Sequence, residues 1–282
     1  MDPTTIFTDI SDFRAYTNGL QADTSYAQLK PSIRTVAADI KEKIPPAVFE
    51  AVAAFGSDAS DDQKAGKELL KTALASGTMA KYAIFDSVKK NGSEASLYKY
   101  QLDEIKAHHA EAFARAMDDL LDWLDANTDT GNYSESPEYA DRQSLPIRNA
   151  AEFDRYFGIG RSSYFFSKII YLMRSVWLGK VKALVGDSED ETVIDLGKRI
   201  LAYRTMAAAV LQFDLTELPR SIRWDSGNEH ASGSAMQDRD RLASQLISQA
   251  EGWEKNLQVR TSTATAMVSD QNAEENKYYA ML

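Results

Sequence analysis

Two adjacent histidines are the first residues whose types and spacing could do chemistry. His108 and His109 lie in "DEIKAHHAEAFARAM", with Glu104 and Glu111 close by. On a helix, Glu104, His108 and Glu111 share one face, as three metal ligands would. A di-iron bundle needs Glu-x-x-His pairs from two helices, and the other half of the chain offers no matching histidine. His109 falls on an apolar stripe, so the pattern predicts packed histidines, with no metal and no cofactor.

An acidic run follows near the end of the same predicted helix. Paired carboxylates can act as general acid and base, but these residues are spread around the solvent side of a helix. Their sign also opposes the negative end of the helix dipole. We interpret the run as a solvated face, with a basic partner as the alternative. The run consists of Asp118, Asp119, Asp122 and Asp125.

The remaining motifs do not indicate catalysis. The segment "GIGRSS" at 158–163 is similar to a phosphate-binding loop, but it lacks the Lys-Ser/Thr ending and a preceding strand. The chain has no cysteine, which excludes disulfides, thiolate metal sites and cysteine nucleophiles. We therefore do not expect an enzyme.

The charge is unevenly distributed. The net charge of −10 is carried by residues 1–141, while residues 142–282 are neutral overall. An acidic protein lacks the excess of cations that dominates nucleic-acid affinity, so we expect no sequence-specific DNA binding. No stretch approaches the roughly 18 apolar residues of a membrane span, so we expect no membrane partner.

Nearly the whole chain reads as α-helix. Glycine and proline fall between periodic segments, and three segments begin with capping-box spacing: Ser60-x-x-Gln63, Asn149-x-x-Glu152 and Ser188-x-x-Glu191. The predicted helices are 9–18, 25–44, 46–55, 60–90, 94–127, 150–157, 163–185, 189–213 and 232–260.

The second half of the chain repeats the first half in the same order. Corresponding positions are 140 residues apart near the start of each half, then 127, and then 130 near the end. The pairs are Asp12/Glu152, Phe13/Phe153, Tyr16/Tyr156, Arg34/Arg174, Val36/Val176, Thr78/Thr205, Met79/Met206 and Trp123/Trp253. Coincidence between Ala-rich helices is the alternative.

This repeat predicts an all-α fold of two tandem related helical bundles, with a long linker and a C-terminal tail. The expected divisions are an acidic N-terminal unit at 1–130, a linker at 131–147, a second unit at 148–260 and a docking tail at 261–282. The linker is placed in "TDTGNYSESPEYADRQSLPI", which is rich in turn formers.

Two segments are candidates for contact with other polypeptides. The stretch "SSYFFSKIIYLMRSVWL" is more apolar all round than a surface helix should be, so a partner or a central core position is expected to cover its second face. The tail ends in aromatic and apolar residues that a neighbouring subunit would hold. The candidate interface residues are Tyr164, Phe165, Phe166, Tyr171, Trp177, Tyr278, Tyr279 and Leu282.

The helix order resembles that of head–tail connector proteins of tailed bacteriophages, of the kind that has two helical units in one chain. The likeness covers about residues 5–260. It is carried by "TDISDFRAYT", by "YAQLKPSIRTVAADIKEKI", by a Gly/Asp-rich connection and by the long Ala-rich helices after it. It is a likeness of helix order and of an "LKPxIxxA" segment, and it assigns no individual functional residue.

The resemblance implies a virion structural protein of the neck, assembled in the host cytoplasm, that joins the portal to the tail and extends the DNA channel. The implied partners are other copies in a ring, typically of twelve, the portal protein, tail or neck proteins, and genomic DNA that passes through without sequence-specific binding. The acidic run Asp118–Asp125 would then face the lumen. Another helical virion or scaffold interaction protein without catalytic activity is the alternative function.

Overall fold

The fold is all-α throughout the part of the chain that the computed structural model describes, which is residues 1–91, 99–214, 217–219, 222 and 232–271. No strand occurs in these residues. None of the described helices combines the length and apolarity needed to cross a membrane. The chain divides into two compact units, as the sequence repeat predicts.

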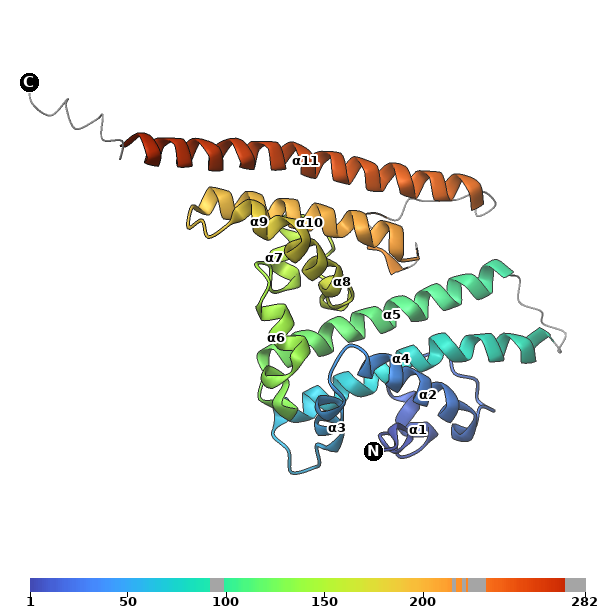
Figure 1. Ribbon diagram of the computed structural model, residues 1–282. Helices are drawn as coiled ribbons and strands as arrows, with labels where there is room; N and C mark the ends of the chain where they lie inside the picture. The colour runs from blue at the N-terminus through green and yellow to red at the C-terminus, as the bar shows by residue number, and fades with distance from the viewer. Residues whose placement is uncertain (92–98, 215–216, 220–221, 223–231, 272–282) are drawn as a thin grey trace, which may run out of the picture. The chain divides into compact units, whose positions relative to one another are not determined.

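The first unit comprises Met1–Ala140 together with Ser162–Ser167. Its long helices α4 and α5 lie side by side (Figure 1), and α2 packs against α4. Its elements are η1 (Pro3–Thr5), α1 (Ile10–Arg14), α2 (Tyr26–Lys41), α3 (Pro46–Ala54), α4 (Asp61–Asn91), α5 (Lys99–Ala126), η2 (Thr130–Glu135) and the start of α6 (Pro137–Gln143).

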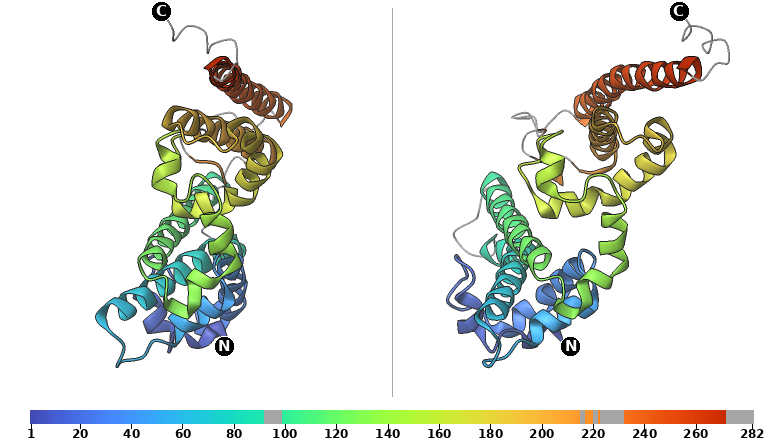
Figure 2. Two further views of the ribbon diagram at one scale, coloured as in Figure 1. Left: turned by 60° about the vertical axis from the view of Figure 1, so that its left-hand side comes forward. Right: turned by 90° about the vertical axis from the view of Figure 1, so that its left-hand side faces the viewer.

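The second unit comprises Asp141–Arg161 and the chain from Lys168 onward. Its long pair is α10 and α11, which lie side by side in both views of Figure 2. Its elements are the end of α6, α7 (Ala150–Asp154), α8 from Lys168 (the whole helix is Ser163–Val176), the π-helical turn η3 (Trp177–Val181), α9 (Lys182–Val185), α10 (Glu191–Gln212) and α11 (Ser232–Gln271).

Apolar spacing of three and four residues builds each core. In the first unit the fully buried Phe13, Ile33 and Leu74 come from α1, α2 and α4. In the second unit Phe153 and Leu201 are also fully buried, and they come from α7 and α10. Each of these side chains contributes roughly 1.5–3 kcal/mol through burial alone.

The expected linker at 131–147 is wrong. Up to Ala140 this segment belongs to the first unit, and Tyr133 is 5% exposed in that unit's core. The turn formers make a compact turn instead of a flexible connection. Gly131 has φ +57°, and a Cβ there would lie 2.8 Å from the Cα of Val48, so glycine allows the turn to approach α3.

The expected boundary at 260 is also wrong. Helix α11 continues without a break to Gln271, eleven residues beyond the predicted end. Ser, Thr and Ala residues in "TSTATA" are weak signals for ending a helix, since none removes a backbone donor. The rest of the expected tail, 272–282, lies outside the described residues.

Candidate interaction surface

The two units hold the same polar contacts at matching positions. In the first unit Asp12 accepts from the backbone N–H of Thr8 at 2.9 Å and pairs with Lys71 Nζ at 3.0 Å. In the second unit Glu152 accepts from the N–H of Arg148 at 3.0 Å and pairs with Lys198 Nζ at 2.6 Å. The residues that correspond between the two units are Thr8 and Arg148, Asp12 and Glu152, and Lys71 and Lys198. The 140- and 127-residue offsets of the sequence repeat are therefore confirmed by contacts.

A tyrosine completes each of these networks. Tyr16 donates its hydroxyl to Glu68, and Tyr156 donates to Asp195 Oδ1 at 3.0 Å. Burial, followed by the hydrogen bond to Asp195, raises the pKa of Tyr156 to about 12. Burial and the Glu68 carboxylate raise the pKa of Tyr16 as well. Both hydroxyls stay protonated donors that pin α1 to α4 and α7 to α10, so these networks are structural.

The matched threonines are equivalent in burial too. Thr78 and Thr205 are both 0% exposed, and neither hydroxyl has a hydrogen-bond partner. The following residues, Met79 and Met206, are both buried. The predicted relationship between α4 and α10 is thus reproduced in detail.

The predicted match between Trp123 and Trp253 is not reproduced. Trp123 lies over Gly66, whose added Cβ would be 2.5 Å from its ring. Trp253 instead packs edge-on against Tyr203, with ring centroids 4.6 Å apart, and lies near Arg199. Gly66 corresponds to Val193, so the partner of Trp253 lies ten residues, or nearly three helical turns, further along α10. Apolar positions recur every three to four residues along a long helix and permit such a shift.

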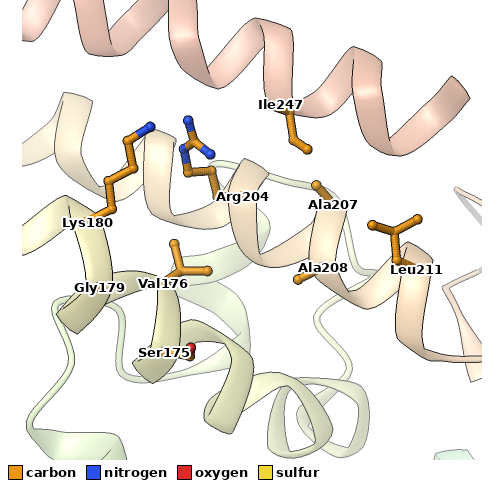
Figure 3. Close-up of a pocket in the computed structure, with 9 residues that line it drawn as sticks. All are labelled: Ser175, Val176, Gly179, Lys180, Arg204, Ala207, Ala208, Leu211 and Ile247. Carbon is orange, nitrogen blue, oxygen red and sulfur yellow. The ribbon is translucent and has the colours of Figure 1, made fainter. Parts of the chain in front are cut away.

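The second unit has an apolar groove that sequence reasoning did not locate. It has a volume of about 280 Å³ and is formed by α8, η3, α10 and α11. Figure 3 shows Ile247 of α11 pointing toward the apolar residues of α10. The lining residues are Ser175, Val176, Gly179, Lys180, Arg204, Ala207, Ala208, Leu211 and Ile247.

Two cations line the groove. In Figure 3 the ends of Lys180 and Arg204 lie close together. Both bind Glu254 of α11: Lys180 Nζ at 2.8 Å and Arg204 through Nε. Glu254 is 7% exposed, and although burial acts to raise its pKa, hydrogen bonds from Arg204 and Lys180 lower that pKa overall. Arg204 Nη2 is buried without a hydrogen-bond acceptor and lies 4.0 Å from the carboxylate of Glu251.

The surface beside the groove is also apolar. Tyr171 is 55% exposed, Leu178 58% and Leu211 50%, in contrast to the buried apolar residues of the cores. Leu211 lines the groove itself, and Tyr171 donates to Gln212 at 3.1 Å, one residue further along α10. An exposed apolar patch next to a hollow is typical of a surface that binds another protein.

The predicted interface residues have different environments. Phe165 and Phe166 are 5% and 2% exposed, because they lie in a core. The prediction that they form an interface is therefore wrong. Tyr164 packs edge-on against Phe113 of the first unit at 5.6 Å. Trp177 is half-buried and Tyr171 is exposed. Tyr278, Tyr279 and Leu282 lie outside the described residues.

The acidic run is partly used inside the first unit. Asp118 Oδ1 accepts from the Tyr164 N–H at 2.7 Å and from the Ser162 hydroxyl at 2.8 Å, and Asp122 accepts from Ser163. Burial raises the pKa of Asp118, although these hydrogen bonds act against it. The carboxylates of Asp118 and Asp122 therefore hold the first turn of α8. Asp119 is exposed and Asp125 is half-buried.

The histidines lie together on α5. His108 is exposed, and its ring is 5.5 Å from that of His109, which is half-buried. Burial, and secondarily the charge of His108, lowers the pKa of His109. Glu111 pairs with Arg115. Within the described residues, no three His, Asp or Glu side chains gather as a metal ion would require.

The segment that is similar to a phosphate loop has its backbone donors occupied. Asp154 Oδ1 accepts from the N–H groups of Ile159 at 2.7 Å and Arg161 at 3.2 Å. Gly160 and Arg161 have positive φ values of 68° and 54°, which form the turn. A carboxylate of the chain thus takes two of the donors that a phosphate would need.

A comparison with protein families matches one model, described as a family of unknown function (DUF6712), over residues 50–143 and 174–260. Together these segments make up more than half of the chain. The chain belongs to this family. The first DUF6712 segment falls almost entirely in the first unit and the other in the second unit. No curated protein and no solved structure matches the chain.

Two signals in the sequence could have indicated the groove. Gly179 stands within a predicted helix, where glycine costs about 1 kcal/mol relative to alanine. Arg204 interrupts the apolar stretch "AYRTMAAAV", where its charge needs a buried partner. Neither signal identifies α11 as the opposite wall, because that depends on the register between α10 and α11.

Proposed function

We propose that this protein is a subunit of the head–tail connector ring of a tailed bacteriophage, where it joins the portal to the tail and extends the DNA channel. The observation that carries the proposal is the apolar groove of the second unit, with exposed Tyr171 and Leu211 at its edge. A surface of this kind serves contact with another polypeptide, and ring subunits need such contacts on every copy.

The sequence resemblance supports the same function. The helix order that carries it, from the short helix α1 through α2 to the long pair α4 and α5, is the order of the first unit. The contacts of Asp12, Lys71 and Tyr16 recur in the second unit, in keeping with the kind of connector that has two related units in one chain. In this proposal the exposed Asp119 faces the DNA channel, where a negative charge lets DNA slide by repelling its phosphates.

Negative-stain microscopy and mass photometry of the full chain, with and without the portal protein, test the proposal. The expected result is a closed cyclic assembly, either alone or bound to the portal vertex. A monodisperse monomer under both conditions would overturn it and favour another helical interaction protein of the virion.

A further inference from the structure

The first unit has a closely packed site at the position that corresponds to the groove of the second unit. Arg204 and Val176 of the groove correspond to Gly77 and Val36 of the first unit. A Cβ on Gly77 would be 2.6 Å from Val36 and 2.9 Å from the ring of Phe113, so this place is closely packed. In the first unit Gly77 thus leaves room for the aromatic ring of Phe113, whereas the second unit has the longer side chain of Arg204 at the matching place.

The π-helical turn η3 accounts for part of the opening. Up to Val176 the two units correspond at an offset of 140, but beyond η3 the buried residues Ile40 and Ile44 correspond to Val181 and Val185, at an offset of 141. The turn therefore accommodates one additional residue. Gly179 lies in it, and an added Cβ there meets no atom within 4 Å.

The chain carries an aromatic segment that complements this groove. Residues 272–282 read "NAEENKYYAML", with Glu274 and Glu275 four residues before Tyr278 and Tyr279. The tyrosines suit the apolar lining. The glutamates suit the end of the groove where the side chain of Lys180 is 45% exposed.

The tyrosines cannot reach the apolar lining beside Ile247 in their own chain. From Ile247 to Gln271, α11 covers 24 residues, which is about 36 Å at 1.5 Å per residue. Tyr278 follows Gln271 by seven residues, which span at most about 25 Å. To lie on the apolar lining beside Ile247, the tyrosines must therefore meet the groove of another copy.

We propose that the groove of the second unit binds segment 272–282 of a neighbouring copy of the chain, with Tyr278 and Tyr279 on the apolar lining and the glutamates toward Lys180 and Arg204. This deepens the proposed function, on which it rests, since it names the contact that links one ring subunit to the next. Such a head-to-tail contact uses different surfaces on the two copies, and it closes into a ring when the rotation between copies permits.

Disulfide crosslinking tests the contact directly, because the natural chain has no cysteine. Full-length Gly179→Cys is mixed with full-length, size-tagged Ala280→Cys under mild oxidation and examined on a non-reducing gel. Ala280 adjoins the tyrosines and leaves both in place. The matched control replaces Gly179→Cys with Gly252→Cys, on the exposed side of α11, where an added Cβ also meets no atom within 4 Å.

We expect at least fivefold more mixed dimer with Gly179→Cys than with Gly252→Cys. In a second measurement, Gly179→Leu fills the groove and is expected to abolish assembly in mass photometry, while Gly252→Leu assembles normally. Equal crosslinking at the two positions overturns the proposal, as does normal assembly of Gly179→Leu.

The same measurements separate this contact from the connector function. Rings or portal complexes that form without the Gly179–Ala280 crosslink overturn the contact and leave the connector proposal standing. Crosslinked copies that neither close into rings nor bind portal confirm the contact and overturn the connector proposal.

Discussion

The two units agree in the contacts that hold their short first helices and differ in how closed their long helix pairs are. Asp12–Lys71 and Glu152–Lys198 are the same ion pair at matched positions, and Tyr16 and Tyr156 make the same hydrogen bond. At the matching site between helices, the first unit is packed tightly over Gly77, whereas the second unit is open beside Arg204. The shared contacts therefore maintain the fold, while the open site is the part available for a separate role.

The largest expected effect comes from the matched phenylalanines of the short helices. Phe13 and Phe153 are both fully buried, so Phe13→Ala and Phe153→Ala should each lower the free energy of unfolding by about 3–5 kcal/mol. Urea unfolding followed by fluorescence measures both losses, with Trp123 as the reporter in the first unit. Val259→Ala, at a 66% exposed position, is the control and should change stability by less than about 0.5 kcal/mol. A loss at only one phenylalanine would break the equivalence of the units.

The matched lysines should give smaller and unequal losses. The side chains of Lys71 and Asp12 are 12% and 19% exposed, whereas both members of the Lys198–Glu152 pair are 22% exposed. Removing the cation leaves a carboxylate unpaired, and this costs more where there is less water. We expect Lys71→Met to cost about 2 kcal/mol and Lys198→Met about 1 kcal/mol in urea unfolding. The reverse order would contradict the role of burial.

The start of α8 offers a third comparison. Helix α2 is capped locally by Ser25 and Gln28, whereas α8 also uses Asp118 of α5. Asp118→Ala should cost about 1–2 kcal/mol in thermal or urea unfolding, because the Tyr164 N–H and the Ser162 hydroxyl lose their acceptor. Asp118→Asn keeps an acceptor oxygen and should cost less than half as much. Equal losses would mean that the negative charge, and not the hydrogen bond, is required.

The smallest expected effect is a pH dependence confined to acid. Burial acts to raise the pKa of Asp12, but the Thr8 N–H and Lys71 lower that pKa overall. Because the pKa is lower in the folded chain, the stabilisation is present above the unfolded Asp value of about 3.9 and is lost as the pH falls through the folded value. The free energy of unfolding, measured by urea between pH 5 and pH 2, should fall less steeply with pH in Asp12→Asn than in the unsubstituted chain. The expected difference is below about 1 kcal/mol. Parallel curves would show that Asp12 contributes nothing to acid unfolding.

The sequence was sufficient for what depends on local spacing. Apolar periodicity and capping residues predicted most of the helices to within a few residues, for example α10 at 191–212 against an expected 189–213. They missed α6 and ended α11 eleven residues too early. The order of Phe13, Tyr16 and Thr78 relative to Phe153, Tyr156 and Thr205 was enough to predict two related units. Such patterns are fixed by which face of a helix is buried, which the sequence records directly.

Features that depend on packing between distant segments were predicted poorly. Turn formers at 131–147 indicate a change of direction, but they do not show that Tyr133 enters a core. The apolar side chains of Phe165 and Phe166 are equally consistent with a core position and with an interface. The groove depends on the register of α11 against α10, and a seven-residue spacing fits more than one register.

The additional residue in η3 has a consequence for how duplicated proteins diverge. Buried residues on either side of this turn keep their counterparts in the first unit, as Ile33 and Met173 do before it and Ile44 and Val185 after it, so the change is absorbed within one turn. Inserting a single codon into one copy of a duplicated segment is thus enough to separate two helices locally without rebuilding the domain. In this chain the same scaffold occurs twice, and one additional residue accompanies the opening in only one of the two.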